Sequence, residues 1–162
     1  MAGTKAGVLV RRKADGKGEV GVLAIRLGER WLAVPADRVA EVMERRPVTP
    51  VPHRMGEIVE GMVNLRGELL MVVSLEAVLG LERTRRDNRR MLVIRHASGR
   101  FVFSADEVYA EVRYSPKAVQ PAPAAWAAPG FSCITGVFEW GDRTVGLLDV
   151  EALVQAVNHR LA

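Results

Sequence analysis

Cysteine is almost absent from this sequence, and its scarcity excludes two kinds of stabilisation. The 162 residues include one cysteine, Cys133, so the chain cannot form an internal disulfide and lacks a second thiolate for a zinc site. The three histidines, His53, His96 and His159, are scattered without helical spacing or a nearby cysteine, so we predict no metal site. With 49% hydrophobic residues the chain can instead bury a sizeable core, as one domain or as two small halves.

Long apolar runs are also missing. No run approaches the roughly 18 apolar residues that a membrane span requires. Near the N-terminus, Val8 to Val10 precede Arg11 and Arg12, which is too short a run and the wrong order for a secretory signal. We therefore expect a protein that stays in the cytosol and does not insert into a membrane.

Recognisable catalytic and cofactor motifs are absent as well. The sequence has no GxGxxG after a strand and no GxxxxGK[ST] motif for phosphate binding. Ser74 and Ser104 have no histidine placed by a motif, which favours cap or loop roles over a nucleophile. Cys133 lies in an apolar context that is typical of a buried small hydrophobic residue. We predict a protein that is not an enzyme, with no catalytic residue and no cofactor.

The net charge of +4 is concentrated in two short stretches. Residues 1–20 and residues 81–90 each carry a net charge of +3, so the rest of the chain has a net charge of about −2. The excess positive charge thus belongs to a tail and a loop rather than to a folded face. A solvated tail and linker explain it, and weak electrostatic contact with an acidic partner or a lipid surface is the alternative.

The most informative stretch is Gly61 to Leu75, in which two apolar runs flank the tight connection Asn-Leu-Arg-Gly. Val63 and Leu65 alternate with polar residues, and Gly67 can take the positive φ of a turn, so the stretch predicts a β-hairpin. Ser74 stands where an N-cap would, at the start of a predicted short helix with apolar residues at positions 75, 78 and 79.

The same arrangement returns later in the chain. Residues 61–78 align with residues 136–153 at an offset of 75, and Ser74 then faces Asp149, another N-cap residue. Residues 22–39 align without a gap on residues 91–108 at an offset of 69. The matched positions include glycine, aspartate and arginine, so we infer that one motif is used twice, with insertions in the loops.

The remaining segments follow from local composition. Residues 39–45 fit either a helix or a strand, and we favour a strand because their repeat partner, residues 108–112, is strand-like. The other expectations are a flexible basic tail at 1–20, a hairpin formed by 22–27 and 31–34, an extended proline-rich segment at 47–52, a polar junction at 83–90, and a loop at 115–130 that partly packs through Trp126.

At this point the stretch GMVNLRGELLMVVSLEAVLGL carries a family resemblance. It resembles the CheW family, the coupling proteins of bacterial chemosensory arrays, whose pattern runs from a glycine through Asn-Leu-Arg-Gly to an apolar strand and a Leu-rich segment. The resemblance extends over residues 21–157 and includes the elements at 48–52, 105–108, 121–123 and 147–149. Asn-Leu-Arg-Gly alone would be a weak match, but its order with these elements is specific.

The resemblance implies an all-β fold of two five-stranded SH3-like β-barrels related by an internal pseudo-twofold, with a few short helices. The implied boundaries are a CheW-like domain at 21–157, with halves at about 21–82 and 91–157, and a C-terminal tail at 158–162. Family members are adaptors that bridge the cytoplasmic tip of a methyl-accepting chemoreceptor and the regulatory domain of a CheA-type histidine kinase.

By position, the receptor-binding residues of the family map onto Val39, Glu41, Gly61, Asn64, Leu65 and Arg66. In this interpretation Val39 and Leu65 bury against the helical tip of the receptor, and Arg66 anchors it through a bidentate bond. The alternative is that Val39 and Leu65 are core residues and that Gly61 is only a turn glycine.

Two features depart from the family pattern. Residues 71–75, Met-Val-Val-Ser-Leu, replace the usual Pro-Val-Ile-Asp-Leu, which puts any contact that needs the acid in doubt, and the basic tail and the arginine cluster are additional. The alternative function is a basic small β-barrel protein that binds nucleic acid. That function needs an aromatic stacking surface lined with cations, and the low aromatic content of 6% argues against it.

Overall fold

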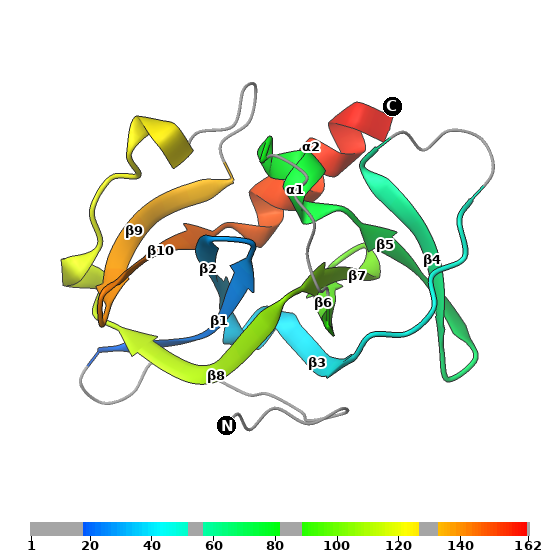
Figure 1. Cartoon of the computed structure of the whole chain (residues 1–162), viewed down its shortest axis with the longest axis horizontal. Helices are drawn as coiled ribbons and strands as arrows, with labels where there is room; N and C mark the ends of the chain where they lie inside the picture. The colour runs from blue at the N-terminus through cyan, green and yellow to red at the C-terminus, as the bar shows by residue number, and fades with distance from the viewer. Residues whose placement is uncertain (1–17, 52–56, 82–88, 127–132, 162) are drawn as a thin grey trace.

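Ten β-strands dominate the part of the chain that the structure describes. The computed structural model describes residues 18–51, 57–81, 89–126 and 133–161 (Figure 1). The strands are β1 (Val20–Leu27), β2 (Arg30–Pro35), β3 (Val39–Glu44), β4 (Val59–Leu65), β5 (Glu68–Val73), β6 (Arg90–His96), β7 (Gly99–Ala105), β8 (Glu107–Tyr114), β9 (Ile134–Trp140) and β10 (Arg143–Leu148). Two α-helices, α1 (Leu75–Leu79) and α2 (Val150–Leu161), and three 3₁₀ turns, η1 (Ala36–Arg38), η2 (Pro116–Ala118) and η3 (Ala124–Trp126), complete the fold.

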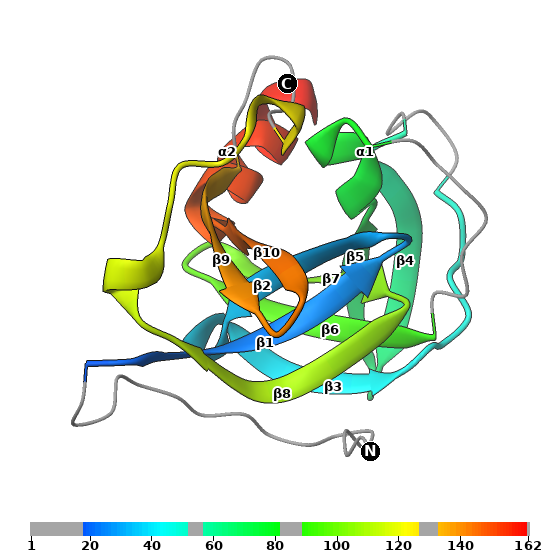
Figure 2. The same ribbon diagram turned by 60° about the vertical axis from the view of Figure 1, so that its left-hand side comes forward.

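The strands form two five-stranded sheets, which we call the first and the second barrel. The first barrel has the order β8-β1-β2-β10-β9 and the second has the order β3-β6-β7-β5-β4. Figure 2 shows them curving beside one another, with both helices on one side. The prediction of an all-β fold with two five-stranded units and a few helices is confirmed.

Each barrel takes strands from both halves of the sequence. The first barrel combines β1 and β2 with β8, β9 and β10, and the second combines β3, β4 and β5 with β6 and β7. Exchanging the two repeat copies converts one strand order into the other, which is the arrangement that a pseudo-twofold axis produces. The halves that we expected at 21–82 and 91–157 are therefore repeats of sequence, and neither of them forms a barrel by itself.

The strand registers match the sequence repeat. Val22 pairs with Pro35 between β1 and β2, and the residues 69 positions later, Met91 and Ser104, pair between β6 and β7. In the β4–β5 hairpin Val59 pairs with Val73, and the equivalent residues 75 positions later pair in the β9–β10 hairpin. Both of these hairpins are shifted in register at the same place, which is typical of a β-bulge. The proposed internal repeat is confirmed at the level of individual pairs.

The predictions of two helix N-caps, of a strand that begins at residue 39 and of the packing of Trp126 are also confirmed. The Ser74 hydroxyl accepts a hydrogen bond from the Ala77 amide at 3.3 Å, and the Asp149 carboxylate accepts one from the Ala152 amide at 3.1 Å. Both residues therefore cap their helices as predicted. Residues 39–44 form β3, which decides between the helix and the strand in favour of the strand. Trp126 is half-buried and packs against the core as expected.

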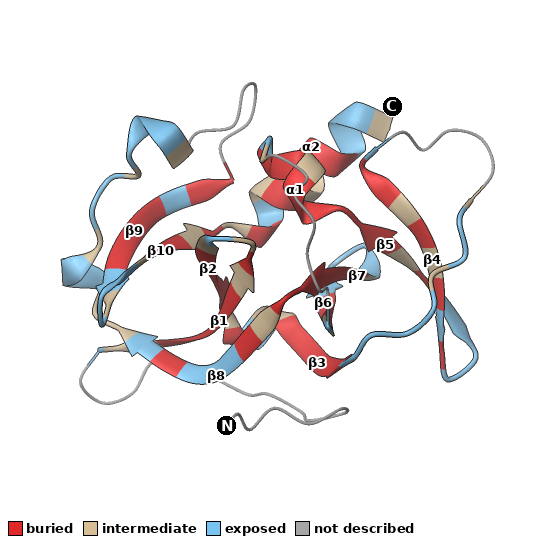
Figure 3. Cartoon of the chain, in the orientation of Figure 1, coloured by how far each residue is buried: buried red, intermediate tan, exposed pale blue. Residues whose placement is uncertain are grey.

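Three apolar clusters hold the fold together. The largest lies between the barrels and includes α1, α2 and one face of β1 and β6, and two smaller clusters fill the barrels themselves. Figure 3 shows the buried positions along the strands and helices. Because strands such as β1 bury both faces, they appear in the sequence as nearly continuous apolar runs.

Several expectations fall at the margins of the described residues. Residues 1–17, His53 and residues 82–88 lie outside them. Helix α2 continues through residues 158–161, which the sequence boundaries set apart as a C-terminal tail. None of the helices in the described ranges is long and apolar enough to cross a membrane.

Candidate functional site

The six predicted receptor-binding positions lie on β3 and on the β4–β5 hairpin, in the second barrel. Val39 and Glu41 belong to β3, while Gly61, Asn64 and Leu65 belong to β4 and Arg66 lies in the turn that follows. Strands β3 and β4 are the two outer strands of this sheet, far apart in its hydrogen-bonded order. The structure brings Glu41 and Arg66 together across the opening between them.

Glu41 and Arg66 form a bidentate ion pair. Arg66 Nη2 donates to Glu41 Oε1 at 2.6 Å, and Nη1 donates to Oε2 at 3.2 Å. The Glu41 side chain is 10% exposed and the Arg66 side chain is 61% exposed, so the carboxylate lies beneath the guanidinium, which faces solvent. Because both carboxylate oxygens of Glu41 bond to Arg66, Glu41 orients the arginine, and the other guanidinium N–H groups remain for a partner.

The electrostatics of the pair favour the charged form of both groups. The hydrogen bond and the charge of Arg66 lower the pKa of Glu41, against the opposing effect of burial, and Arg46 and Arg100 lower it further. The hydrogen bond to Glu41 raises the pKa of Arg66. Arg66 holds its position with a φ of 51°, in the left-handed region, which is uncommon for a residue other than glycine. The tight hairpin turn thus presents a fixed cation.

Asn64 and two neighbouring side chains hold the turn in place. The Asn64 side-chain oxygen accepts a hydrogen bond from the Gly67 amide at 2.9 Å. Glu68 forms an ion pair with Arg100 of β7, the strand beside β5 in the second barrel. The tip of the β4–β5 hairpin is therefore fixed both within the turn and to a neighbouring strand.

Val39 and Leu65 are buried inside the chain. Val39 is 0% exposed in the cluster between the barrels, and Leu65 is 2% exposed in the cluster of the second barrel. The chain itself covers both side chains, and a direct contact of either with a receptor stays a prediction. Their alternative interpretation as core residues agrees with the structure.

The position of Gly61 has no room for a side chain. Its φ is 151°, and an added Cβ atom would lie 2.2 Å from the Thr49 carbonyl oxygen. The backbone of Thr49 bonds to that of Met62 in both directions, at 2.8 and 2.9 Å, so the proline-rich segment lies directly on β4. Gly136 occupies the equivalent position, and an added Cβ there would lie 2.9 Å from the Gln120 carbonyl oxygen.

The most exposed apolar side chain at this site is not among the residues predicted from the sequence. Leu69 on β5 is 63% exposed, while its neighbour Leu70 is buried. Leu69 pairs with Asn64 of β4 and so lies beside the polar residues of the hairpin. Strict alternation along β5 was the available signal, because burial of Leu70 and Val72 directs Leu69 outward.

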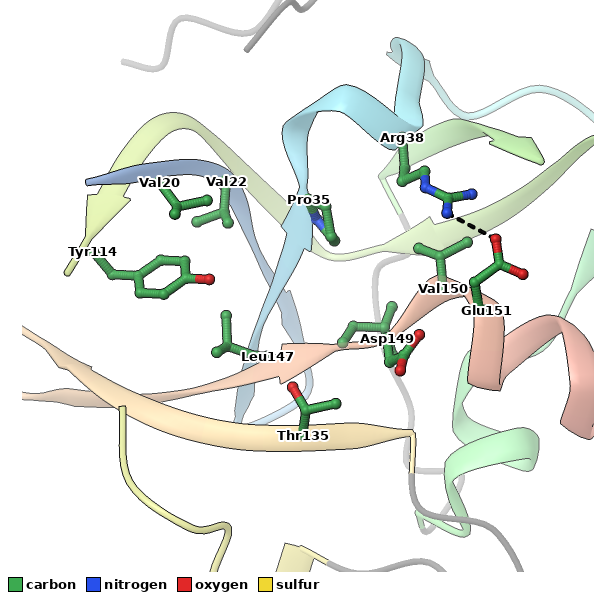
Figure 4. A pocket seen from close by; sticks show the side chains of 11 residues that line it. Val20, Val22, Pro35, Arg38, Tyr114, Thr135, Leu147, Asp149, Val150 and Glu151 are labelled. Atoms are coloured by element: carbon green, nitrogen blue, oxygen red, sulfur yellow. Dashed lines mark hydrogen bonds and ion pairs between the residues drawn. The ribbon is translucent and has the colours of Figure 1, made fainter. Parts of the chain in front are cut away.

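A separate cavity of about 260 Å³ lies beside the start of α2 (Figure 4). Its wall is mostly apolar, and Arg38 at its rim donates to Glu151 at 2.7 Å. The His96 ring nitrogen Nε2 lies 2.9 Å from the same carboxylate, and bonds from His96 and Arg38 lower the pKa of Glu151. These contacts join η1 and β6 to α2, and we assign the group a structural role.

The chemistry of the described residues offers neither an exposed thiol nor a metal centre. Cys133 is buried, and that burial raises the pKa of its thiol. Within the described ranges, no three histidine, cysteine, aspartate or glutamate residues gather in a way that could hold a metal ion. Arg45 donates to the Ser104 hydroxyl at 3.1 Å, and the Ser74 hydroxyl caps α1.

Comparison with known proteins gives a consistent family assignment. The family model described as CheW-like domain matches residues 21–158. The chemotaxis protein CheW of Thermotoga maritima is 33% identical over 100 residues, which cover 62% of this chain and 66% of that protein. The chemotaxis protein CheW of Rhizobium meliloti is 26% identical, and the match covers 82% of this chain and 85% of that protein.

Two further similarities extend the comparison. Protein PilI of Pseudomonas aeruginosa is 33% identical over 88 residues, covering 54% of this chain and 49% of that protein. The crystal structure of the scaffolding protein TtCheW from Thermoanaerobacter tengcongensis superposes with a TM-score of 0.68 at 19% identity, covering 80% of this chain and 88% of that one. This last similarity concerns the fold alone.

Proposed function

The chain belongs to the family of CheW-like domains, and on this premise we propose that it is a non-catalytic adaptor that couples methyl-accepting chemoreceptors to a CheA-type histidine kinase. Its place would be the cytoplasm, recruited to membrane-associated receptor arrays. The named relatives support this proposal, since they are chemotaxis proteins and a scaffolding protein.

The observation that carries the proposal is the exposed guanidinium of Arg66 on its buried carboxylate. The Arg66 side chain is 61% exposed, so the N–H groups of its guanidinium that do not bond to Glu41 face solvent and can meet a partner. Glu41 holds the guanidinium, and Asn64 and Gly67 hold the turn that carries it. A cation fixed in this way can bind a carboxylate or a backbone carbonyl on the helical tip of a receptor.

The candidate receptor surface is therefore narrower than the six positions that the family pattern suggested. Arg66 and Asn64 offer exposed side chains, Glu41 positions Arg66, and Gly61 permits the packing of the strand behind them. Leu69 adds an exposed apolar side chain beside Asn64. We propose these residues as the receptor-binding surface, with Val39 and Leu65 acting from the core through their packing.

The arrangement of the hydroxyl and thiol groups is in keeping with a non-catalytic role. The Ser74 and Ser104 hydroxyls are each engaged in a structural hydrogen bond, and Cys133 is buried with a raised thiol pKa. The Ser74 hydroxyl also donates to the Glu76 carboxylate at 3.4 Å, within the first turn of the helix that Ser74 caps.

The test is a pull-down of the full chain with the receptor tip and the kinase regulatory domain of the same organism, in moderate salt. We expect a ternary complex. The Arg66→Ala variant should lose receptor capture while its circular dichroism and unfolding curve stay close to those of the wild type. Lys117→Ala, which removes an exposed cation from η2 in the other barrel, is the matched control and should bind normally.

Three outcomes would contradict parts of the proposal. Unchanged capture by Arg66→Ala would remove this residue from the interface, and unfolding of that variant would make it structural. Binding to nucleic acid alone, abolished by added salt, would mean that the fold is kept for another function, because phosphate contacts weaken steeply with salt.

A further inference from the structure

The cavity beside the start of α2, which we call the mouth cavity, lies at the edge of the interior of the first barrel. Val20, Tyr114 and Leu147 line it, and the same three side chains pack against the apolar cluster that fills this barrel. Pro35 and the first turn of α2 complete the wall (Figure 4). The mouths of β-barrels are among the places where proteins most often bind small molecules.

The equivalent mouth of the second barrel is bridged by a hydrogen bond. The repeat offset of 69 aligns Tyr114 with Arg45 and Pro35 with Ser104, and Arg45 donates to the Ser104 hydroxyl at 3.1 Å. The backbone pairs are equivalent here, since Tyr114 pairs with the start of β1 and the Arg45 amide bonds to the residue before β6. A proline side chain has neither donor nor acceptor, so Tyr114 and Pro35 cannot form this bridge across the first barrel.

The Tyr114 hydroxyl group points into the mouth cavity without a protein partner. The tyrosine ring stacks on Phe138 of β9, with centroids 4.8 Å apart and an angle of 16° between the planes, which fixes the orientation of the side chain. Figure 4 shows the hydroxyl directed toward the space between Leu147 and Pro35, and the hydrogen bonds within the described residues do not include it. Burial raises the pKa of Tyr114, so the hydroxyl keeps its proton at neutral pH and can donate it to an acceptor.

The charged groups of the wall are already compensated within the chain. Glu151 accepts from Arg38 at 2.7 Å and lies 2.9 Å from the His96 ring. Asp149 accepts from the Ala152 amide at 3.1 Å, and the positive end of the α2 dipole offsets its charge. An ionic ligand would lose its hydration on entering the cavity without gaining an uncompensated counter-ion, which is unfavourable. The wall therefore favours an uncharged ligand.

The volume of the cavity limits the size of that ligand. An apolar cavity of about 150 Å³ can hold a benzene molecule. The mouth cavity, at about 260 Å³, therefore has room for one ring with a short substituent. A polar group on the substituent can then reach the Tyr114 hydroxyl while the ring stays against the apolar wall.

We propose that the mouth cavity binds a small uncharged molecule with an apolar body of about one ring and one hydrogen-bond acceptor for the Tyr114 hydroxyl. The body packs against Val22 and Leu147, which line the cavity with Tyr114. Because Arg38 and the first turn of α2 also line it, the ligand lies beside the contacts that join η1 to α2. A ligand that binds only the folded chain also raises its stability.

An NMR titration of the full chain, isotopically labelled on its amides, tests the site with three probes that share one body. Phenethyl alcohol is uncharged, phenethylamine is a cation at neutral pH, and phenylacetate is an anion. Phenethyl alcohol should give saturable shifts at the amides of the cavity wall, with a Kd on the order of 1 mM. The two ions should bind at least about tenfold more weakly, because each loses hydration without compensation.

Two variants locate the binding. Tyr114→Phe removes only the hydroxyl and keeps the ring on Phe138, so the affinity for phenethyl alcohol should fall roughly three- to tenfold, as expected for one hydrogen bond. Val20→Trp places a large side chain in the wall and should abolish the shifts. Tyr109→Phe, the same change at an exposed tyrosine of the same strand, is the matched control and should bind as the wild type does. Circular dichroism checks that each variant is folded, and Tyr114→Phe decides the test if Val20→Trp is not.

The proposal is overturned if phenethyl alcohol gives no saturable shift, or if the shifts lie away from the cavity wall. Equal affinity for the alcohol and for either ion would contradict the uncharged class of ligand. Equal affinity of Tyr114→Phe and the wild type would contradict the role of the hydroxyl. In the pull-down described above, Tyr114→Phe should still capture the receptor tip, so failure of either proposal is seen separately.

Discussion

The substitution Gly61→Ala tests whether the close approach of the proline-rich segment to β4 stabilises the fold. The new Cβ atom would lie 2.2 Å from the Thr49 carbonyl oxygen and 2.8 Å from its carbonyl carbon. These are backbone atoms, so the contact cannot be relieved by a change of rotamer. The segment around Thr49 must move away from β4, and it then loses its two hydrogen bonds to Met62.

The expected cost follows from two contributions. Two backbone hydrogen bonds at about 0.5–1.5 kcal/mol each amount to about 1–3 kcal/mol. An alanine held at the φ of 151° adds strain of about 1–3 kcal/mol. The free energy of unfolding should therefore fall by about 2–6 kcal/mol, which for a chain of this size lowers Tm by on the order of 10 °C.

Urea unfolding followed by circular dichroism measures this loss, and two other glycines serve as controls. Gly67 has a φ of 88° but no atom within 4 Å of an added Cβ, so Gly67→Ala should cost only the strain, about 1–2 kcal/mol. Gly136→Ala meets a valine methyl at 2.6 Å and a carbonyl oxygen at 2.9 Å, and should fall between the two. Equal losses for Gly61→Ala and Gly67→Ala would refute the role of the close approach.

The remaining predictions concern burial and charge. Leu65→Ala should lower the free energy of unfolding by about 2–5 kcal/mol and Leu69→Ala by less than about 0.5 kcal/mol in urea titrations, and similar losses would contradict their assigned positions. Arg66 lowers the pKa of Glu41, so the Glu41 carboxylate binds a proton more tightly in the unfolded chain than in the folded one. The resulting stabilisation is present at neutral pH and is lost as the pH falls through the lowered pKa of Glu41. Glu41→Gln should therefore flatten this part of the curve of unfolding free energy against pH. Cys133 should react with a thiol reagent only at the rate of unfolding, and fast labelling of the native protein would contradict its burial.

Much of the fold could be predicted because the repeat marks residues with special backbone roles. Gly61 and Gly136 align because each lies under a neighbouring chain segment, and Ser74 and Asp149 align because each caps a helix. These requirements are local, so each one restricts the residue type at its own position and can be recognised in a single sequence. Once the two copies of the repeat are aligned, the same strand register is expected in both.

The exchange of strands between the barrels could not be predicted in the same way. β10 lies parallel to β2 and β5 lies parallel to β7, and these pairs join segments that are distant in sequence. Alternation within a strand tells which side chains share a face, but it does not tell which other strand lies alongside. The neighbouring strand is determined by the packing that buries both apolar faces of each sheet at the same time.

The same double burial explains why the sequence left two interpretations of Val39 and Leu65 open. An apolar residue next to polar ones on an edge strand can face either a partner or a second core. In this fold one sheet face lines a barrel and the other faces the cluster between the barrels, so apolar side chains on either face are covered. Arg66 was easier to place, because a turn offers an arginine no core in which to pack.

The two copies of the repeat carry different side chains at equivalent hairpin tips. The repeat aligns Arg66 with Gly141 and Glu41 with Ala110, so the first barrel lacks both members of the ion pair found at the β4–β5 hairpin. Since the registers of the two hairpins are the same, backbone geometry cannot account for this difference. Side chains alone distinguish a fixed cation over a buried acid from a cation stacked on indoles. A ligand that recognises one of these hairpin tips by its side chains would therefore not recognise the other.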